Sequence, residues 1–202
     1  MSVAANSLIT LAQFKAYAAI STTDAARDAA IEAIIDAVSS FFCSFLGREI
    51  ALTTYTNEYM DGNGEPDLLL PYYPVKTISS ITEDDAALTE GLTADYLLYA
   101  KEGRLHRMGG NWLNLPKAIK LTYSAGYIVQ GATPSTGETA LPLDLKLACM
   151  MQVGAEWKRA QRSEWGLSGI SVEGGSISML SQDSLLPQVL AILRGYKGIL
   201  AE

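Results

Sequence analysis

The sequence has very few of the side chains on which most catalytic and metal chemistry depends. Its 202 residues include one histidine and two cysteines, fewer than a zinc site of several imidazoles or thiolates requires. It also lacks a phosphate-binding glycine loop that ends in Lys-Ser or Lys-Thr, and a dinucleotide-binding glycine fingerprint. Chemistry driven by ATP or NAD is therefore not expected, and no cofactor and no metal site is predicted.

Positive charge is also scarce, since 15 Lys and Arg face 22 Asp and Glu and the formal net charge is -7. Affinity for nucleic acid comes mainly from cations that displace counterions at phosphates. A protein that binds DNA tightly is therefore not expected. A negative net charge is compatible with a channel wall past which DNA slides. The charged fraction is only 18%, against about 25% in ordinary soluble domains. Part of the surface is thus expected to join other proteins.

The sequence gives no signal for secretion or for a membrane partner. Its N-terminus lacks a basic region followed by an apolar run, and no segment has 18 uninterrupted apolar residues. Cys43 and Cys149 lie among apolar residues in segments with helical periodicity. This setting is typical of reduced, buried thiols in a cytoplasmic protein.

The two ends of the chain have helical periodicity. Thr10 and Gln13 have the spacing of a capping box, which predicts a short helix that starts at Leu11. Gly47 has the position expected of the residue that follows a long second helix. The predicted helices cover residues 11–19, 23–46, 142–161 and 187–199.

The central part alternates between apolar and polar residues, which predicts strands. A hairpin is expected between the first two strands, with Asp61–Gly64 as its turn, and Glu83–Asp85 is expected to be an exposed tip. A second short hairpin is predicted at 170–179. The main predicted strands cover residues 54–60, 67–70, 75–81, 96–99, 104–107 and 118–123.

These elements predict an α+β fold in one domain, residues 1–202. A helical bundle is expected from the N- and C-terminal parts, residues 8–47 and 142–200. An antiparallel β-meander, at about residues 52–127, is expected to be inserted between them.

Two groups of residues resemble reactive sites in part. Asp61, Asn63, Glu65 and Asp67 alternate like the first ligands of a calcium loop, but Pro66 stands where that loop needs glycine. A plain turn is the favoured interpretation. Glu83, Asp84 and Asp85 could act as paired carboxylates, but on a turn they are more simply explained as solvated side chains.

A small hydrolase is the alternative from a different functional class. His106 could pair with Cys149, or with Cys43, as a Cys-His nucleophile, although an apolar setting raises the pKa of a thiol. Ser168 lies in a Gly-Leu-Ser-Gly segment that resembles part of a nucleophile elbow without its full spacing. Cys149 and Ser168 are the candidate nucleophiles of this alternative.

Two clusters on the predicted helices are candidates for contacts with other molecules. Lys158, Arg159 and Arg162 gather near a helix end, where they complement the backbone dipole, and DNA contact is the minor alternative. The C-terminal helix is unusually apolar, which fits burial in the core and docking into a partner equally well. The interface candidates on or beside this helix are Leu186, Val189, Leu190, Leu193, Tyr196 and Ile199.

Several patterned segments together resemble the bacteriophage head-tail connector (adaptor) family. They are the opening Leu8–Tyr17, the helix end Phe45–Arg48, and the segments Tyr72–Ile78, Leu121–Tyr127 and Leu141–Ala148. The likeness covers most of the chain.

The resemblance implies a structural protein without catalytic activity. The expected assembly is a homo-oligomeric ring, a dodecamer in the virion, that docks below the portal protein and meets a stopper or terminator protein on the tail side. DNA is expected to pass through its channel without sequence-specific binding. The expected location is the head-tail neck of the virion, with the host cytoplasm as the place of assembly. Another neck or tail-completion protein is the nearest alternative.

Overall fold

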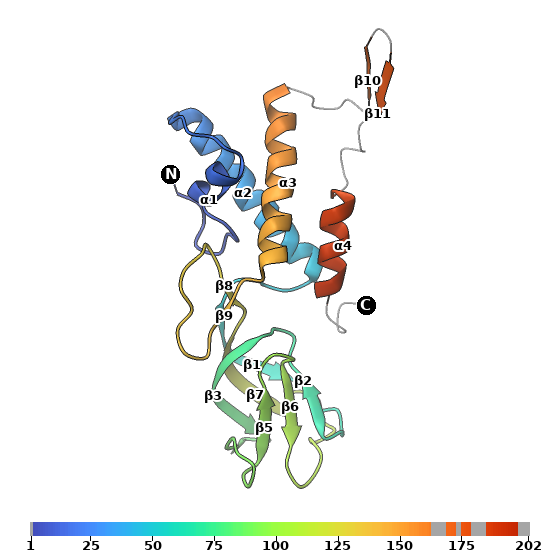
Figure 1. The fold of residues 1–202 in the computed structure, drawn as a ribbon. Coiled ribbons are helices and arrows are strands. Elements are labelled where there is room, and N and C mark those ends of the chain that lie inside the picture. Colours follow the sequence, from blue (N-terminus) through green and yellow to red (C-terminus); the bar gives the residue numbers. More distant parts are fainter. Residues whose placement is uncertain (1, 163–168, 173–174, 179–184, 198–202) are drawn as a thin grey trace. The chain divides into compact units, whose positions relative to one another are not determined.

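The computed structural model describes residues 2–162, 169–172, 175–178 and 185–197. Two compact units can be distinguished (Figure 1). The helical unit consists of Met1–Leu46 with Pro142–Ala201, and the β unit consists of Gly47–Leu141. The mixed α+β class with a β-rich centre is thereby confirmed. That the two units belong to one domain stays a prediction.

The helical unit contains the predicted helices with small changes at their ends. Its helices are α1 Leu11–Tyr17, α2 Ala25–Leu46, α3 Leu143–Arg162 and α4 Pro187–Tyr196. Two short strands, β10 (Gly169–Val172) and β11 (Gly175–Ser178), pair antiparallel, as the alternation at 170–179 predicts.

Local side-chain chemistry explains where the first two helices begin and end. Thr10 Oγ1 accepts the backbone N–H of Gln13 at 3.2 Å, and Gln13 Oε1 accepts that of Thr10 at 3.1 Å, which confirms the capping box. Asp24 Oδ1 accepts the N–H groups of Ala26 and Arg27 at the start of α2. Gly47 follows Leu46 with φ 67°, a left-handed conformation that costs glycine little.

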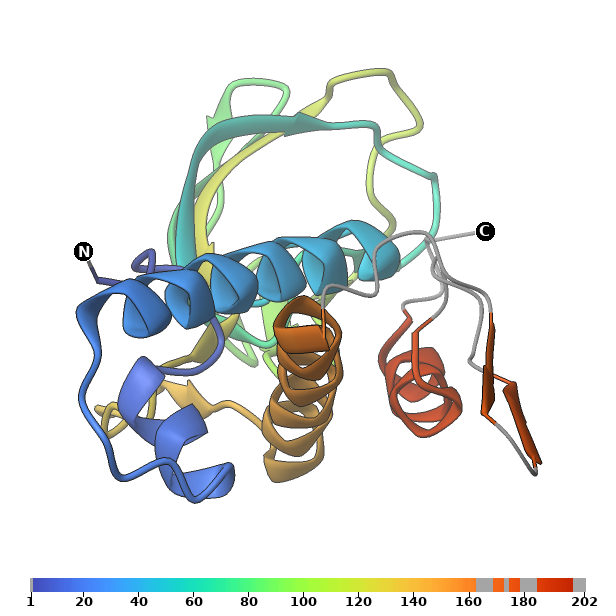
Figure 2. The ribbon, with the colours of Figure 1, turned by 90° about the horizontal axis from the view of Figure 1, so that it is seen from above.

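α1 and α4 flank α3, and α2 packs against all three helices (Figures 1 and 2). α2 is long and apolar enough to cross a membrane by length and composition. Six of its side chains are buried here, among them Ile31, Ile35 and Phe42, and a core helix of a soluble protein passes the same test. The absence of a membrane partner therefore stays a prediction.

The β unit contains two main sheets. The first has the order β1-β7-β3-β4 and the second the order β2-β6-β5, while β8 and β9 form a parallel pair. The strands are β1 Thr53–Met60, β2 Asp67–Leu69, β3 Val75–Glu83, β4 Ala86–Ala87, β5 Tyr96–Tyr99, β6 Arg104–Arg107, β7 Ile119–Ala125, β8 Tyr127–Ile128 and β9 Thr139–Ala140.

The antiparallel pairing within the two main sheets is confirmed, but the simple meander is wrong. β7 lies between β1 and β3, and β6 lies between β2 and β5, so neighbours in a sheet are often distant in sequence. The physical reason is burial. β7 alternates strictly, with Ile119, Leu121, Tyr123 and Ala125 buried, and it therefore takes the central place in its sheet.

The hairpin expected between the first two strands is also wrong. β1 pairs with β7, and β2 pairs with β6. The residues of the expected turn bond to another loop instead. Asp61 Oδ1 accepts the N–H of Lys117 at 2.7 Å, and the N–H of Gly62 donates to the carbonyl of Leu115 at 3.0 Å.

The two sheets share one hydrophobic cluster. Trp112, Tyr123 and Leu105 are among the fully buried side chains of this cluster, and Trp112 Nε1 donates to the carbonyl of Pro66 at 3.1 Å. Burial of large apolar side chains holds the sheets together, since each contributes roughly 1.5–3 kcal/mol of transfer free energy.

Candidate interaction surfaces

α4, which carries most of the predicted interface residues, has one side in the core of the helical unit. Val189 and Leu193 are fully buried. At the start of α4, the N–H of Leu186 donates to Gln152 Oε1 at 3.1 Å, and at its end the hydroxyl of Tyr196 donates to the carboxylate of Asp144 at 2.7 and 2.8 Å. Both partners belong to α3, so α4 is fastened to that helix at both ends.

The predicted interface residues therefore separate into two groups. Val189 and Leu193 fill the core, whereas Leu186, Leu190 and Tyr196 are half-buried and keep part of their surface accessible. Ile199 lies outside the described residues. Contact of this helix with a partner stays a prediction.

A groove of about 700 Å³ lies on the helical unit between α1 and α3. Phe14, Tyr17, Met151 and Trp157 give it apolar walls, and Gly154 leaves room on the α3 side. The charged side chains along it are Arg27 and Lys158. An apolar groove with basic residues suits a partner that offers an apolar side chain next to acidic ones.

Sequence reasoning did not identify this groove. A usable signal was present, because Met151, Gly154 and Lys158, which line the groove, follow one stripe of α3 that is opposite its buried stripe. Leu143 and Leu147 continue this stripe outside the groove. Leu143 is 82% exposed, and Leu147 is also exposed.

The β unit has a different kind of exposed surface. Its loop between β4 and β5 presents Leu92, which is 76% exposed. The chain has no Lys or Arg from residue 77 to residue 100, and it has five acidic residues in that stretch. Leu92 is therefore an apolar side chain on an acidic segment.

This loop is held by hydrogen bonds. Asp95 Oδ2 accepts the N–H of Thr89 at 2.8 Å and its hydroxyl at 3.0 Å, and the N–H of Gly91 donates to the carbonyl of Tyr96 at 2.9 Å. The backbone hydrogen bond from Thr89 is the main cause that lowers the pKa of Asp95. The loop thus presents Leu92 on a backbone that is already ordered.

Glu83, expected at an exposed tip, is buried, and that expectation is wrong. Glu83 is 7% exposed. Its Oε2 pairs with Arg107 at 3.2 Å, and its Oε1 accepts the N–H of Leu113 at 2.8 Å. Asp84 and Asp85 are exposed at the turn, with positive φ. Because the carboxylate has a cation and a backbone donor, its burial is compensated.

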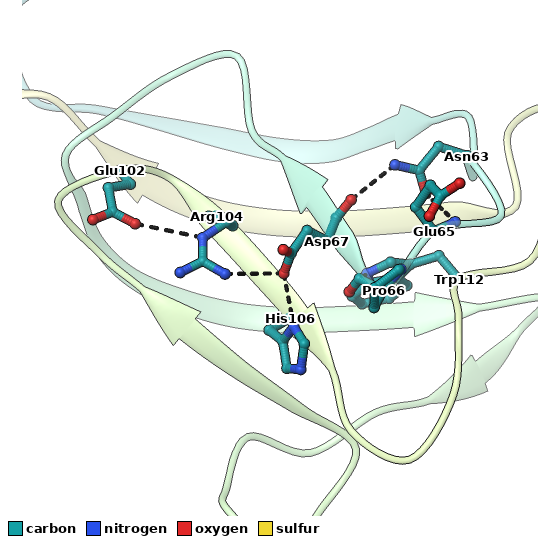
Figure 3. A network of polar contacts seen from close by, with 8 residues as sticks. All are labelled: Asn63, Glu65, Pro66, Asp67, Glu102, Arg104, His106 and Trp112. Atoms are coloured by element: carbon teal, nitrogen blue, oxygen red, sulfur yellow. Dashed lines mark hydrogen bonds and ion pairs between the residues drawn. The ribbon is translucent and has the colours of Figure 1, made fainter.

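A second polar network lies on the sheet β2-β6-β5 (Figure 3). Asp67 Oδ1 lies 2.7 Å from His106 Nδ1 and 3.0 Å from Arg104 Nη1. Glu102 pairs with Arg104 at 3.4 Å. The hydrogen bond to His106, followed by that to Arg104, lowers the pKa of Asp67. His106 is thus a strand residue on the sheet face, as expected.

Three of the four side chains that resemble calcium-loop ligands, those of Asp61, Asn63 and Asp67, have hydrogen-bond partners in the protein. Asn63 donates from Nδ2 to the carbonyl of Asp67, and its Oδ1 accepts the N–H of Glu65. Asp61 and Asp67 are bound as described above. Among the described residues, no group of three or more His, Cys, Asp or Glu side chains could hold a metal ion. The loop is a hydrogen-bonded turn.

The candidate nucleophiles of the hydrolase alternative gain no support from the described residues. Cys149 is fully buried, and burial raises the pKa of its thiol to about 12, so little thiolate forms at neutral pH. Cys43 is half-buried. Ser168 lies outside the described residues.

Comparison with solved structures identifies the class of fold. The chain resembles a chain in "Virion of native gene transfer agent (GTA) particle", with a TM-score of 0.58 and 17% identity over 98% of this chain and 93% of that one. It also resembles a chain in "Neck of empty GTA particle computed with C6 symmetry", with a TM-score of 0.52 and 18% identity over 98% and 95%. The fold is therefore one found in chains of gene transfer agent particles.

The family follows from the sequence itself. The model of the head completion protein family matches residues 7–199, and the chain belongs to that family. No curated protein matches the chain. Membership in this family confirms the predicted resemblance to head-tail connector proteins and a structural role in head completion.

Proposed function

We propose that the chain is a subunit of a homo-oligomeric ring in the neck of a tailed phage or phage-like particle. The ring docks below the portal protein and extends the DNA channel towards the tail. The match to head completion proteins over residues 7–199 carries this proposal. The likeness to a chain in a particle neck that was computed with C6 symmetry also supports it, since a dodecamer is compatible with sixfold symmetry.

The charge of the chain suits a channel that DNA passes through. The β unit has twelve Asp and Glu against seven Lys and Arg. An acidic wall would repel phosphates and would not form the cation-phosphate contacts that produce non-specific binding. In this role DNA passes without sequence-specific recognition.

The half-buried side of α4 is the proposed portal contact. Val189 and Leu193 hold the helix in the core, while Leu190 and Tyr196 keep accessible surface. Deletion of α4 would expose the core and would not test docking by itself. The point variant Leu190→Asp should abolish portal binding while the circular dichroism spectrum of the chain is unchanged, and Arg194→Asp, at an exposed position of the same helix, is the matched control. Native portal binding by Leu190→Asp would remove α4 from the proposal.

Imaging of an intact particle at its neck tests the function. A ring of this chain between the capsid vertex and the tail is the expected result. A position farther along the tail would favour another neck or tail-completion protein, and absence of the chain from the particle would contradict the proposal.

The proposed role is non-enzymatic and places the chain in the virion, with assembly in the host cytoplasm. Burial of Cys149 supports the non-enzymatic role. Thiol- and serine-reactive probes applied to the folded chain should label neither Cys149 nor Ser168. Rapid labelling of either residue would revive the hydrolase alternative.

A further inference from the structure

The α1–α3 groove and the Leu92 loop belong to one chain and have complementary chemistry. The groove has apolar walls that include Phe14 and Trp157, and its basic residues are Arg27 and Lys158. The loop has an apolar apex at Leu92 and an exposed carboxylate at Glu90, two residues away. We propose that Leu92 of one copy docks into the α1–α3 groove of the neighbouring copy, with Glu90 next to Lys158.

The groove is suited to such a side chain. Its volume of about 700 Å³ exceeds what one leucine needs, so it can also receive parts of the loop backbone beside Leu92. Tyr17, at the groove, is 48% exposed, which leaves a large aromatic surface for a partner to cover. Tyrosine, tryptophan and arginine, which all line this groove, are enriched among the residues that contribute most to binding at protein interfaces.

The loop needs little reorganisation to bind. Asp95 already fixes Thr89 through two hydrogen bonds, and Arg107 Nη1 donates to the carbonyl of Asp95 at 2.8 Å. A loop held in this way loses less conformational entropy on docking than a free one. The exposed leucine is therefore presented in advance of contact.

The type of contact has a consequence for symmetry. The groove and the loop are different surfaces, so the contact is heterologous, and repetition of a heterologous contact gives a closed ring or an open filament. This inference rests on the proposed ring and names one of its subunit contacts. A loop in a groove is smaller than a standard interface of about 800 Å² per partner, so weak association of free subunits is expected.

Sedimentation of the full-length chain over a concentration series tests the contact. Leu92→Ser should weaken self-association at least about tenfold, because the buried leucine is lost. Leu143→Ser removes an equally exposed leucine outside the groove and the loop, and it should sediment like the native chain. Self-association of Leu92→Ser at the native level would overturn the inference.

Charge reversal gives a sharper test. Lys158→Glu and Glu90→Lys should each weaken self-association by roughly 5- to 20-fold, since each puts like charges together. An equimolar mixture should associate again, because every contact between the two variants pairs opposite charges. Failure of the mixture to associate, or a native chain that stays monomeric at every concentration, overturns the inference.

Cross-linking in the particle separates this inference from the proposed function. In a Cys43→Ser background, particles that carry both Leu92→Cys and Lys158→Cys should give disulfide-linked oligomers, and particles with either substitution alone should not give the 92–158 link. A ring at the neck without that link would overturn the inference and leave the proposed function standing. Absence of the ring would overturn the proposed function itself.

Discussion

The two units of the chain are stabilised in different ways. In the helical unit, apolar side chains such as Phe14, Phe42 and Leu193 fill the interior. The β unit has an apolar cluster too, but ionic and aromatic contacts link its loops and sheets. There, Arg107 pairs with Glu83, and the Tyr55 ring stacks on Tyr72 at 4.0 Å. The helical unit should therefore respond most to loss of volume, and the β unit also to loss of charge or of a backbone fit.

The largest expected effect is a cavity in the helical unit. Phe42→Ala should lower the free energy of unfolding by about 3–5 kcal/mol, because a fully buried aromatic side chain is lost. Phe41→Ala, at the adjacent and 48% exposed position, should cost less than about 1.5 kcal/mol. Urea unfolding followed by circular dichroism measures both. Equal losses would mean that the burial of α2 differs from the one described.

A break in the buried ion pair of the β unit should have the next largest effect. Glu83→Gln should cost about 3 kcal/mol, the low end for a broken buried pair, because Arg107 keeps the carboxylate of Asp95 at 3.6 Å. The neighbouring variant Asp84→Asn alters an exposed residue whose positive φ asparagine tolerates, and it should change stability little. Calorimetric unfolding would distinguish the two, and a neutral Glu83→Gln would refute the proposed ionic contribution.

A backbone contact provides the third test. A Cβ at Gly62 would lie 1.7 Å from the carbonyl oxygen of Leu113, so Gly62→Ala must displace the loop and should cost about 1–3 kcal/mol. At Gly110 a Cβ would have open space, and Gly110→Ala should be neutral within about 0.5 kcal/mol. Urea midpoints of the two variants measure the difference, and a neutral Gly62→Ala would show that the contact is not tight.

The smallest effect concerns pH. The pKa values of Asp67, Asp95 and Glu138 are all lowered, by His106, Thr89 and Lys76 respectively. A carboxyl with a lowered folded-state pKa stabilises the fold above its unfolded pKa of about 4 and loses that contribution as the pH falls through its folded pKa. The β unit should therefore weaken below about pH 4. Asp67→Asn should reduce the dependence of stability on pH in an acid titration followed by NMR. If the loss of stability below about pH 4 is the same as in the native chain, the contribution of Asp67 is contradicted.

Local chemistry allowed the helices to be predicted, whereas the sheet partners could not be. The capping box at Thr10 and the glycine at Gly47 act within a few residues, so the sequence alone specifies them. The partner of β1 depends on which distant strand best completes the core, and β7 lies about 65 residues away. The burial of Glu83 has the same cause, because its partners Arg107 and Leu113 are remote in sequence.

The candidate surfaces were foreseen only in part. An apolar C-terminal helix could be identified from composition, but its division into a buried side at Val189 and a half-buried side at Leu190 required the packing against α3. The groove depends on α1 lying beside α3, and the exposed stripe of α3 indicates only one of its two walls. The lack of Lys and Arg from residue 77 to 100 is visible in the sequence. It indicates a contact surface only once the structure shows that Leu92, in the same segment, is exposed.

The segments through which the chain enters and leaves the β unit are both hydrogen-bonded to the same short strand, β8. The N–H of Leu52 donates to the carbonyl of Tyr127, and that of Tyr127 to Ile50, both at 2.8 Å, while the N–H of Leu141 donates to Ile128 at 3.0 Å. The two connections of the β unit to the rest of the chain are thus held close together by backbone hydrogen bonds. Because its two ends are held close together, the β unit could be lengthened, exchanged or removed in evolution without a change in the order of the helices. A protein engineer could replace it with a short polar linker.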